Sequence, residues 1–146
     1  MEAIIFTGIQ ASGKSTFYKQ RFADTHVRIN LDMLKTRHRE KMLLLCCLDI
    51  SQSFVIDNTN LTRQDRQRYL PKILAAGIPV HGYFFDTRLE DALGRNRLRG
   101  DRSIPEKGVR GAFSRLECLD SAEGYTTLSR VIIRDHSFDV RCLGMI

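Results

Sequence analysis

An octapeptide near the N-terminus, GIQASGKS from Gly8 to Ser15, leaves few folds open to this chain because it fits G-x-x-x-x-G-K-[ST] in full. Its glycines let the backbone curl, so that successive N–H groups face phosphate oxygens at the start of a helix. In such a loop the lysine reaches the β- and γ-phosphates and the serine hydroxyl binds Mg²⁺. The apolar run Ala3–Thr7 before the loop and a helix expected at 14–23 after it are the context that the motif requires. The pattern predicts a nucleoside triphosphate site, with a plain glycine turn as the alternative.

The remainder of the chain alternates short apolar segments with helical ones. Strands are expected at 3–7, 27–30, 53–57, 80–85 and 125–134, and helices at 14–23, 32–48, 62–76, 89–99 and 106–116. Thr62 followed by Asp65 predicts a capping box, and Pro71 predicts a kink or a shorter helix there. This alternation predicts an α/β fold with a central, mainly parallel sheet of about five strands flanked by helices. Residues 135–146 carry no motif.

The helix expected at 32–48 opens with Asp32. The candidates for its apolar face are Met33, Leu34, Met42, Leu45 and Cys46.

Length and hydropathy predict one domain, 1–146, in the cytoplasm. The longest apolar run, Met42–Leu48, is far shorter than the roughly 18 residues of a membrane span. The start of the chain has an acid, Glu2, and no basic region, which is unlike a signal peptide. Four cysteines without zinc or redox spacing fit a reducing compartment.

Arginine accounts for most of the positive charge. The net charge is +6, and 17 of the 23 basic residues are arginine, the side chain suited to bidentate phosphate contacts. Five arginines lie between Arg88 and Arg102, and positions 88, 95, 99 and 102 follow helical spacing. These four side chains are expected on one face of a helical lid, about 88–105, over the bound nucleotide. The alternative is a solvated face paired with nearby acids.

Two aspartates follow predicted strands, at the edge where a parallel sheet meets its ligands. Asp32, after 27–30, is either the group that takes a proton from an acceptor hydroxyl or an N-cap. Asp57, at the end of 53–57, either holds the water shell of a metal ion or is a solvated turn residue.

Four segments in order, GIQASGKSTF, VRINLD, VIDNTNL and RNRLRGDRSIP, resemble the kinase domain of the 5′-hydroxyl polynucleotide kinases. That family includes phage end-healing enzymes and the kinase modules of bacterial and eukaryotic polynucleotide kinase–phosphatases. The similarity runs from about Ile4 to Ile133, and D-N-T-N combined with R-x-x-x-R-G…I-P is more specific than the phosphate-binding loop alone. The resemblance implies a P-loop kinase-like fold that uses Mg²⁺ and ATP or another nucleoside triphosphate.

The resemblance also implies residue roles. Asp32 matches the general base on the 5′-hydroxyl, and Arg95 and Arg99 match lid arginines that hold ATP phosphates and the transition state. Nucleotide contacts are implied for the loop residues Gly8, Gln10, Ala11, Ser12, Gly13, Lys14, Ser15 and Thr16, with Ser15 and, through water, Asp57 at the metal. Acceptor contacts are implied for Asp32, Asn58, Thr59 and Asn60.

One position departs from the family pattern. Lys35 stands where the phage enzymes have an arginine that grips the acceptor 3′-phosphate, and Arg37 lies close by. Both residues are therefore candidates for that contact.

The expected reaction is transfer of the γ-phosphate of ATP to the 5′-hydroxyl end of RNA or DNA, as in nucleic-acid end healing or repair. The chain has no D-x-D-G-T phosphatase signature and no ligase module, so such activities are expected in other polypeptides or domains acting on the same ends. One alternative is a kinase of a small hydroxylated metabolite or nucleoside. Another is a non-catalytic ATP-binding regulatory module. The type of nucleic acid, the preferred donor and the oligomeric state stay open.

Overall fold

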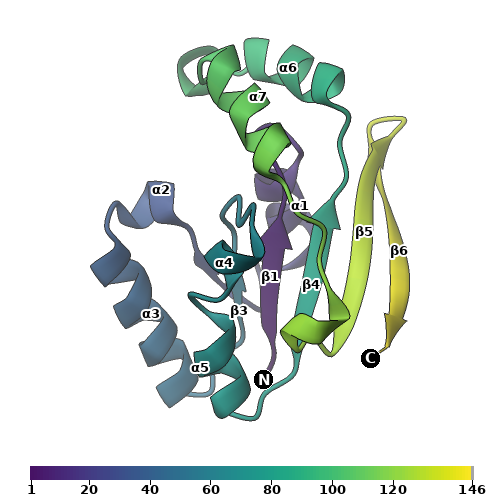
Figure 1. Cartoon of the computed structure of the whole chain (residues 1–146). Helices are drawn as coiled ribbons and strands as arrows, with labels where there is room; N and C mark the ends of the chain where they lie inside the picture. The colour runs from purple at the N-terminus through teal and green to yellow at the C-terminus, as the bar shows by residue number, and fades with distance from the viewer. Residues whose placement is uncertain (146) are drawn as a thin grey trace.

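A six-stranded sheet in the order β2-β3-β1-β4-β5-β6 forms the centre of the computed structural model, which describes residues 1–145. The strands β1 to β5 are parallel, and β6 is antiparallel to β5. Their bounds are β1 Ala3–Thr7, β2 Val27–Ile29, β3 Phe54–Ile56, β4 Val80–Phe85, β5 Thr127–Arg134 and β6 Ser137–Met145. The expected α/β class and mainly parallel sheet are confirmed (Figure 1).

Helices cover both faces of the sheet and its upper edge (Figure 1). The α-helices are α1 Lys14–Arg21, α2 Leu31–Leu34, α3 Arg37–Asp49, α4 Arg63–Arg66, α5 Leu70–Ala75, α6 Leu89–Arg97 and α7 Glu106–Arg115. Two 3-10 turns, Gly100–Arg102 and Ser121–Glu123, complete the list. Within residues 1–145, no helix combines the length and apolarity that crossing a bilayer demands.

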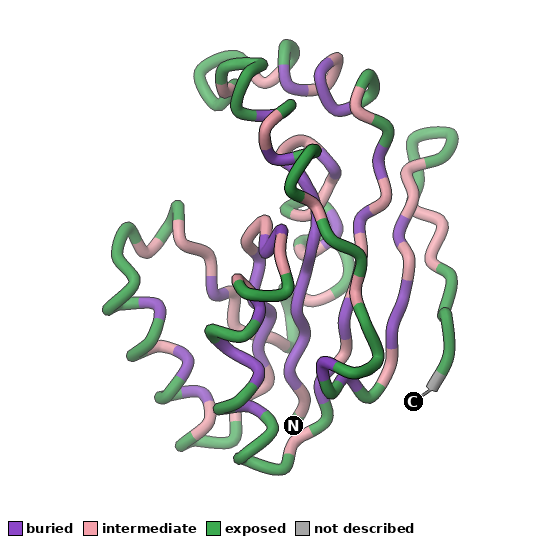
Figure 2. Tube along the Cα trace, viewed as in Figure 1, coloured by how far each residue is buried: buried purple, intermediate pink, exposed green. Residues whose placement is uncertain are grey.

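Strand β1 lies between two apolar clusters, one on each face of the sheet. Ile5 packs with Leu44 of α3 and Ile73 of α5 on one face, whereas Phe6 packs with Phe17 of α1 on the other. This division follows from the two-residue period of a strand, and it explains why β1 is buried throughout in Figure 2. A third apolar cluster joins α6 and α7 to the loops above the sheet.

The helix expected at 32–48 is broken, and its expected apolar face was wrong except for Leu34, which packs against the core. Lys35 has a φ of +73° between α2 and α3, and the Thr36 hydroxyl caps the new helix. The break resets the helical phase, so Met42 and Leu45 of the expected face are exposed. Glu40, Leu44 and Cys47 are the buried residues of α3 instead, and a carboxylate therefore lies inside the protein.

The sixth strand was not expected from the sequence. Residues 135–146 showed no pattern, yet β6 pairs along the whole of β5 after a tight turn. Asp135 and His136 adopt positive φ values of 50° and 61°, the conformation of a type I′ hairpin turn. Asparagine and glycine usually occupy that turn, so the sequence lacked the signal by which such a turn is normally predicted. Residue 146 lies outside the described residues.

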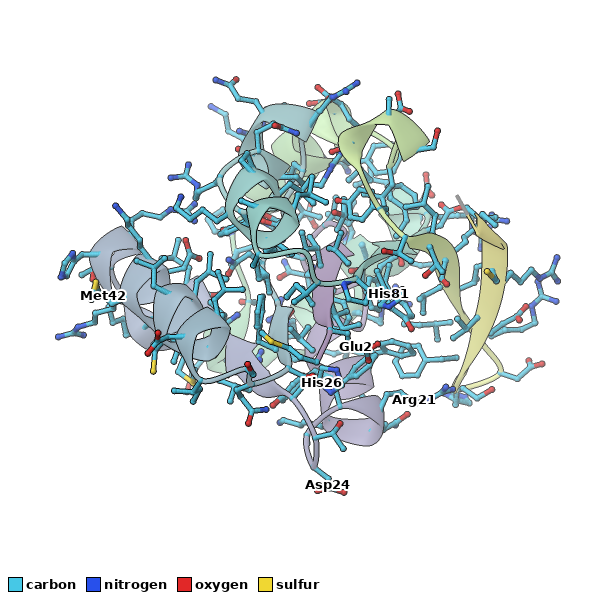
Figure 3. All side chains as sticks on the ribbon, turned by 90° about the horizontal axis from the view of Figure 1, so that it is seen from below. Glu2, Arg21, Asp24, His26, Met42 and His81 are labelled. Atoms are coloured by element: carbon cyan, nitrogen blue, oxygen red, sulfur yellow. The ribbon has the colours of Figure 1, made fainter. Side chains whose placement is uncertain are left out.

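The two edges of the parallel sheet differ in their chemistry. At the lower edge, the Glu2 carboxylate lies 3.1 Å from His26 Nε2 and 3.2 Å from His81 Nε2 (Figure 3). At the opposite edge, the carboxyl ends of β1, β2 and β3 lead into the phosphate-binding loop, α2 and the D-N-T-N segment. This upper edge is where ligands bind in open parallel sheets.

Candidate active site

A cleft of about 740 Å³ opens at the carboxyl edge of the sheet, between the ends of the strands and helices α6 and α7. Its charged lining consists of seven cationic residues (Lys14, Arg37, Arg68, Arg95, Arg99, Arg102 and Arg115) and three acids (Asp32, Asp57 and Asp65). The excess of positive charge in a concave space favours an anionic ligand.

The phosphate-binding loop connects β1 to α1 and is held from behind by the β5–β6 hairpin. Gly13 has a φ of +94°, and a Cβ there would lie 2.9 Å from the Phe138 ring. A Cβ on Gly8 would lie 2.8 Å from Phe85 Cβ. Both positions therefore need glycine. No side chain caps the start of α1, which leaves its first N–H groups free to meet an anion.

Lys14 is folded back into this loop. Its Nζ donates to the carbonyl oxygens of Gly8, at 2.8 Å, and Ile9, at 2.6 Å. Burial lowers the pKa of Lys14 from 10.5 to about 8, because the ammonium loses water contacts that carbonyl oxygens replace only in part. The bound form of the site must supply further negative charge to keep this lysine fully protonated.

Arg95 of α6 is anchored to the same loop. Its Nε donates to the carbonyl oxygen of Ala11 at 2.7 Å. Its Nη2 is buried and has no hydrogen-bond partner among residues 1–145. Burial lowers the pKa of Arg95. A buried donor without a partner beside a phosphate-binding loop indicates a missing acceptor, and a phosphate oxygen fits that requirement.

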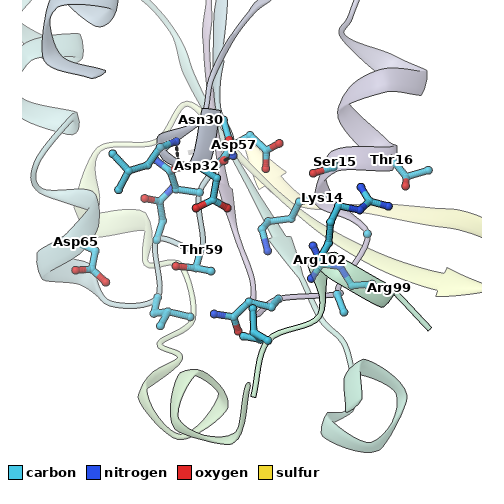
Figure 4. A pocket seen from close by; sticks show the side chains of 18 of the residues that line it. Lys14, Ser15, Thr16, Asn30, Asp32, Asp57, Thr59, Asp65, Arg99 and Arg102 are labelled. Atoms are coloured by element: carbon cyan, nitrogen blue, oxygen red, sulfur yellow. Dashed lines mark hydrogen bonds between the residues drawn. The ribbon is translucent and has the colours of Figure 1, made fainter. Parts of the chain in front are cut away.

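The lid arginines do not form the single face expected from their spacing. Helix α6 ends at Arg97, and Arg99 and Arg102 line the cleft beyond it (Figure 4). Arg88 instead precedes α6 and pairs on the surface with Asp91, with Nε 3.1 Å from Oδ2. The expectation for position 88 was therefore wrong, because the helix is too short to carry all four arginines.

Asp32 lies in α2 and lines the cleft opposite the loop. The N-cap of α2 is Asn30, whose Oδ1 accepts from Met33 N at 2.9 Å, so Asp32 does not cap the helix. Asp32 is exposed and has no hydrogen-bond or ion-pair partner in the part of the chain that the structure describes. Figure 4 shows its carboxylate facing Lys14 across the pocket.

A buried polar network holds α2 and the start of α3 in place. Asn58 Oδ1 accepts from Leu31 N at 2.8 Å, and its Nδ2 donates to Glu40 Oε2 at 2.8 Å. The Tyr69 hydroxyl donates to the same Glu40 oxygen, and burial raises the pKa of Tyr69 to about 12. Asn58 thus links the D-N-T-N segment to α2 through Leu31 and to α3 through the buried carboxylate of Glu40.

The two candidates for the acceptor phosphate contact differ in position. Arg37 lines the cleft, and its Nη1 donates to Glu40 Oε1 at 2.8 Å and to the Tyr69 hydroxyl at 3.0 Å. Lys35 is exposed at the end of α2 and is not among the residues that line the cleft. The geometry therefore favours Arg37.

Thr59 and Asn60, the last two residues of the D-N-T-N segment, also line the cleft. Asn60 is buried, and its Nδ2 donates to the carbonyl oxygen of Phe6 at 2.8 Å. Thr59 accepts from Gly8 N through its backbone carbonyl at 2.9 Å, which leaves its side chain facing the pocket in Figure 4. The amide of Asn60 is used within the protein, so Thr59 is the better placed of the two for a ligand.

The residues expected at a metal ion are engaged by an arginine that sequence reasoning missed. Arg28 Nε donates to Asp57 Oδ2 at 2.8 Å, and its Nη2 donates to Ser15 Oγ at 2.8 Å. A hydroxyl and a carboxylate suit Mg²⁺, which commonly uses one or two carboxylates together with substrate phosphates. The donor set therefore fits the ion, provided that Arg28 moves aside. Arg28 sits in VRINLD without any local signal of this role.

Arg66 is a second missed residue, although it lies outside the cleft. It is fully buried and forms a bidentate pair with Glu123, at 2.8 and 3.0 Å. It also donates to the carbonyl oxygens of Asn60 and Leu61. Arg66 thereby fixes the end of the D-N-T-N segment to the loop that precedes β5.

Comparison with known proteins supports the resemblance drawn from the motifs. No family model matches the chain. The chain is 27% identical over 135 residues to the bifunctional polynucleotide phosphatase/kinase of Schizosaccharomyces pombe. The match covers 89% of this chain and 33% of the relative, so the chain spans about a third of that protein's length.

Two solved structures share the fold. A chain of the Pnkp1/Rnl/Hen1 RNA repair complex matches with a TM-score of 0.67 and 22% identity, over 79% of this chain and 43% of that one. A gluconokinase from Sinorhizobium meliloti matches with a TM-score of 0.61 and 15% identity, over 90% and 82% of the two chains. The chain has the fold of P-loop kinases, and its resemblance to the kinase domain of polynucleotide kinases is confirmed.

Proposed function

We propose that this chain is a phosphotransferase that moves the γ-phosphate of ATP to the 5′-hydroxyl end of a polynucleotide. One observation carries the proposal: the Asp32 carboxylate, without a partner in the described chain, faces Lys14 across a cleft rich in arginine. A carboxylate free to take a proton, placed opposite a phosphate-binding lysine, is what phosphoryl transfer to a hydroxyl requires.

In the proposed reaction, the 5′-oxygen attacks the γ-phosphorus in line with the leaving β–γ oxygen. Asp32 accepts the hydroxyl proton as the new P–O bond forms and the bond to ADP breaks. Lys14, Arg95 and Arg99 stabilise the charge on the transferring group. Mg²⁺, held by Ser15 and through water by Asp57, would offset the charge of the triphosphate.

The acceptor is proposed to lie on the Asp32 side of the cleft, with Arg37 at its phosphate and Thr59 beside it. Asn58 and Asn60 support this wall, because their amides bond within the protein. The similarity to a bifunctional phosphatase/kinase and to a chain of an RNA repair complex supports a polynucleotide acceptor. It also supports a separate phosphatase or ligase, in another domain or polypeptide, acting on the same ends. The gluconokinase fold match keeps a small hydroxylated acceptor as the second candidate.

The test measures transfer of labelled γ-phosphate to 5′-OH RNA, 5′-OH DNA, a 3′-mononucleotide, a nucleoside and a sugar. Wild-type protein should label the oligonucleotides, and Asp32→Asn should lose about 10²- to 10⁴-fold in rate while nucleotide affinity stays unchanged. Asp24→Asn, an exposed aspartate in the loop before β2 on the underside of the molecule (Figure 3), is the matched control and should keep full activity. Equal activity of Asp32→Asn and wild type would refute the assignment of the base. Labelling of the sugar or nucleoside alone would favour the small-acceptor kinase.

A further inference from the structure

A second concave site adjoins the cleft, between α3 and the segment that leads from α4 into α5. It encloses about 150 Å³ and shares Arg37, Arg68 and Tyr69 with the lining of the cleft. Helices α3 and α5 lie side by side in Figures 1 and 2, and Leu44 and Ile73 pack in one core cluster beneath them. The site is therefore a groove that continues the cleft away from the lid.

Four cations border this groove in two matched pairs. Arg37 and Lys41 are four residues apart at the start of α3, and Arg68 and Lys72 have the same spacing where α4 passes into α5. Along α3, four residues correspond to a rise of about 6 Å, whereas Arg68 lies in the turn between α4 and α5 and Lys72 lies in α5. Each side of the groove thus presents two positive charges along its length.

These charges are poorly neutralised by the protein. Glu40 is the acid in the groove lining, and it is buried and bonded to Arg37, Tyr69 and Asn58. Lys41, Arg68 and Lys72 are exposed and have no ion-pair partner within residues 1–145. Four cations around one small groove repel each other, so the arrangement gains stability when an anion with repeated charges lies between them.

We infer that the groove between α3 and α5 binds the backbone phosphates of a single-stranded polynucleotide, beyond the nucleotide whose 5′-hydroxyl enters the cleft. The inference rests on the proposed function and extends it to the length of the acceptor. Regularly spaced charges on a flexible strand match paired cations on two helices, and single-strand binding uses such positively charged grooves. A mononucleotide would end in the cleft and leave the groove unused.

Lys41 and Lys72 provide a clean test because they line the groove and are not among the cleft residues. The double variant Lys41→Ala/Lys72→Ala should weaken binding of a 5′-OH 12-mer about tenfold, measured by fluorescence anisotropy. The slope of log affinity against log salt should fall by about 1.4 when two phosphate contacts to a single strand are lost. Lys19→Ala/Lys107→Ala, which removes two exposed lysines from α1 and α7, is the matched control and should change neither quantity.

Phosphoryl-transfer assays with a long and a short acceptor then distinguish an effect on acceptor binding in the groove from an effect on the chemical step. The groove variant should raise the KM for the 12-mer and leave the KM for ATP and for a 3′-mononucleotide unchanged. Equal losses for long and short acceptors, or none for either, would overturn the inference. Binding of polyglutamate but not of the 12-mer would overturn it too, in favour of an acidic protein partner. Because anisotropy needs no turnover, groove binding of the 12-mer without phosphoryl transfer would support the groove and refute the proposed function alone.

Discussion

Binding of a nucleoside triphosphate should restore the pKa of Lys14 and therefore take up a proton at alkaline pH. In the nucleotide-free protein, burial against the carbonyl oxygens of Gly8 and Ile9 lowers that pKa from 10.5 to about 8. A polyphosphate placed in the loop adds several negative charges at the ammonium, which favours the protonated form. In the free protein Lys14 is thus half charged near pH 8, mostly charged below that pH and mostly neutral above it.

The size of the effect follows from the two pKa values. If binding restores the ordinary lysine pKa of 10.5 from about 8 in the free protein, it takes up about 0.2 proton at pH 7.5 and about 0.9 proton at pH 9.5. If the charged form alone binds tightly, affinity falls about 25-fold between these two pH values. The nucleotide's own phosphates are fully ionised across most of this window, so they contribute little.

Isothermal titration with a non-hydrolysable ATP analogue, in buffers of different ionisation enthalpy, measures both quantities. Lys19→Met on the exposed side of α1 should behave as wild type, whereas residual binding to Lys14→Met should show no alkaline proton uptake. An affinity and a proton uptake that are the same at pH 7.5 and pH 9.5 would refute the reasoning, because Lys14 would then be fully charged in the free loop.

Three further substitutions test the surroundings of the cleft. Arg66→Met leaves the Glu123 carboxylate buried and unpaired and should lower the free energy of unfolding by about 3–5 kcal/mol in urea denaturation. The double variant Arg66→Met/Glu123→Leu should recover most of the lost stability. An unchanged free energy of unfolding in the single variant would contradict this view. Arg28→Met frees both proposed metal-binding groups and should tighten Mn²⁺ binding in the presence of ADP about tenfold by EPR titration; weaker Mn²⁺ binding would show that Arg28 assists the ion. Asn58→Leu should lower kcat more than ATP affinity, because it loosens the helix that carries Asp32; an unchanged kcat would argue against this positioning role.

Short-range signals predicted most of the fold. The capping box of Thr62 and Asp65 is present as expected. The helix expected at 62–76 is divided into α4 and α5, and Pro71 lies in the first turn of α5, where its missing N–H costs no helical hydrogen bond. Both effects act within one helical turn. The sixth strand escaped prediction because it depends on β5 for its hydrogen bonds and on a turn of Asp135 and His136. The break at Lys35 likewise turned the face of α3, so Glu40, Leu44 and Cys47 are buried in place of the apolar residues expected there.

In the candidate site, too, local features were predictable from the sequence and long-range contacts were not. The sequence alone determined the phosphate-binding loop, the acid after β2 and the arginine-rich segment 88–102, since each is contained in a few consecutive residues and their chemistry is local. Only the tertiary structure decided which group each arginine meets: Arg28 reaches the Asp57 carboxylate across 29 residues, and Arg95 reaches the backbone carbonyl of Ala11 across 84. It also brought α3 and α5 together to form the basic groove. Such contacts are set by strand order and helix packing, which no short stretch of sequence encodes.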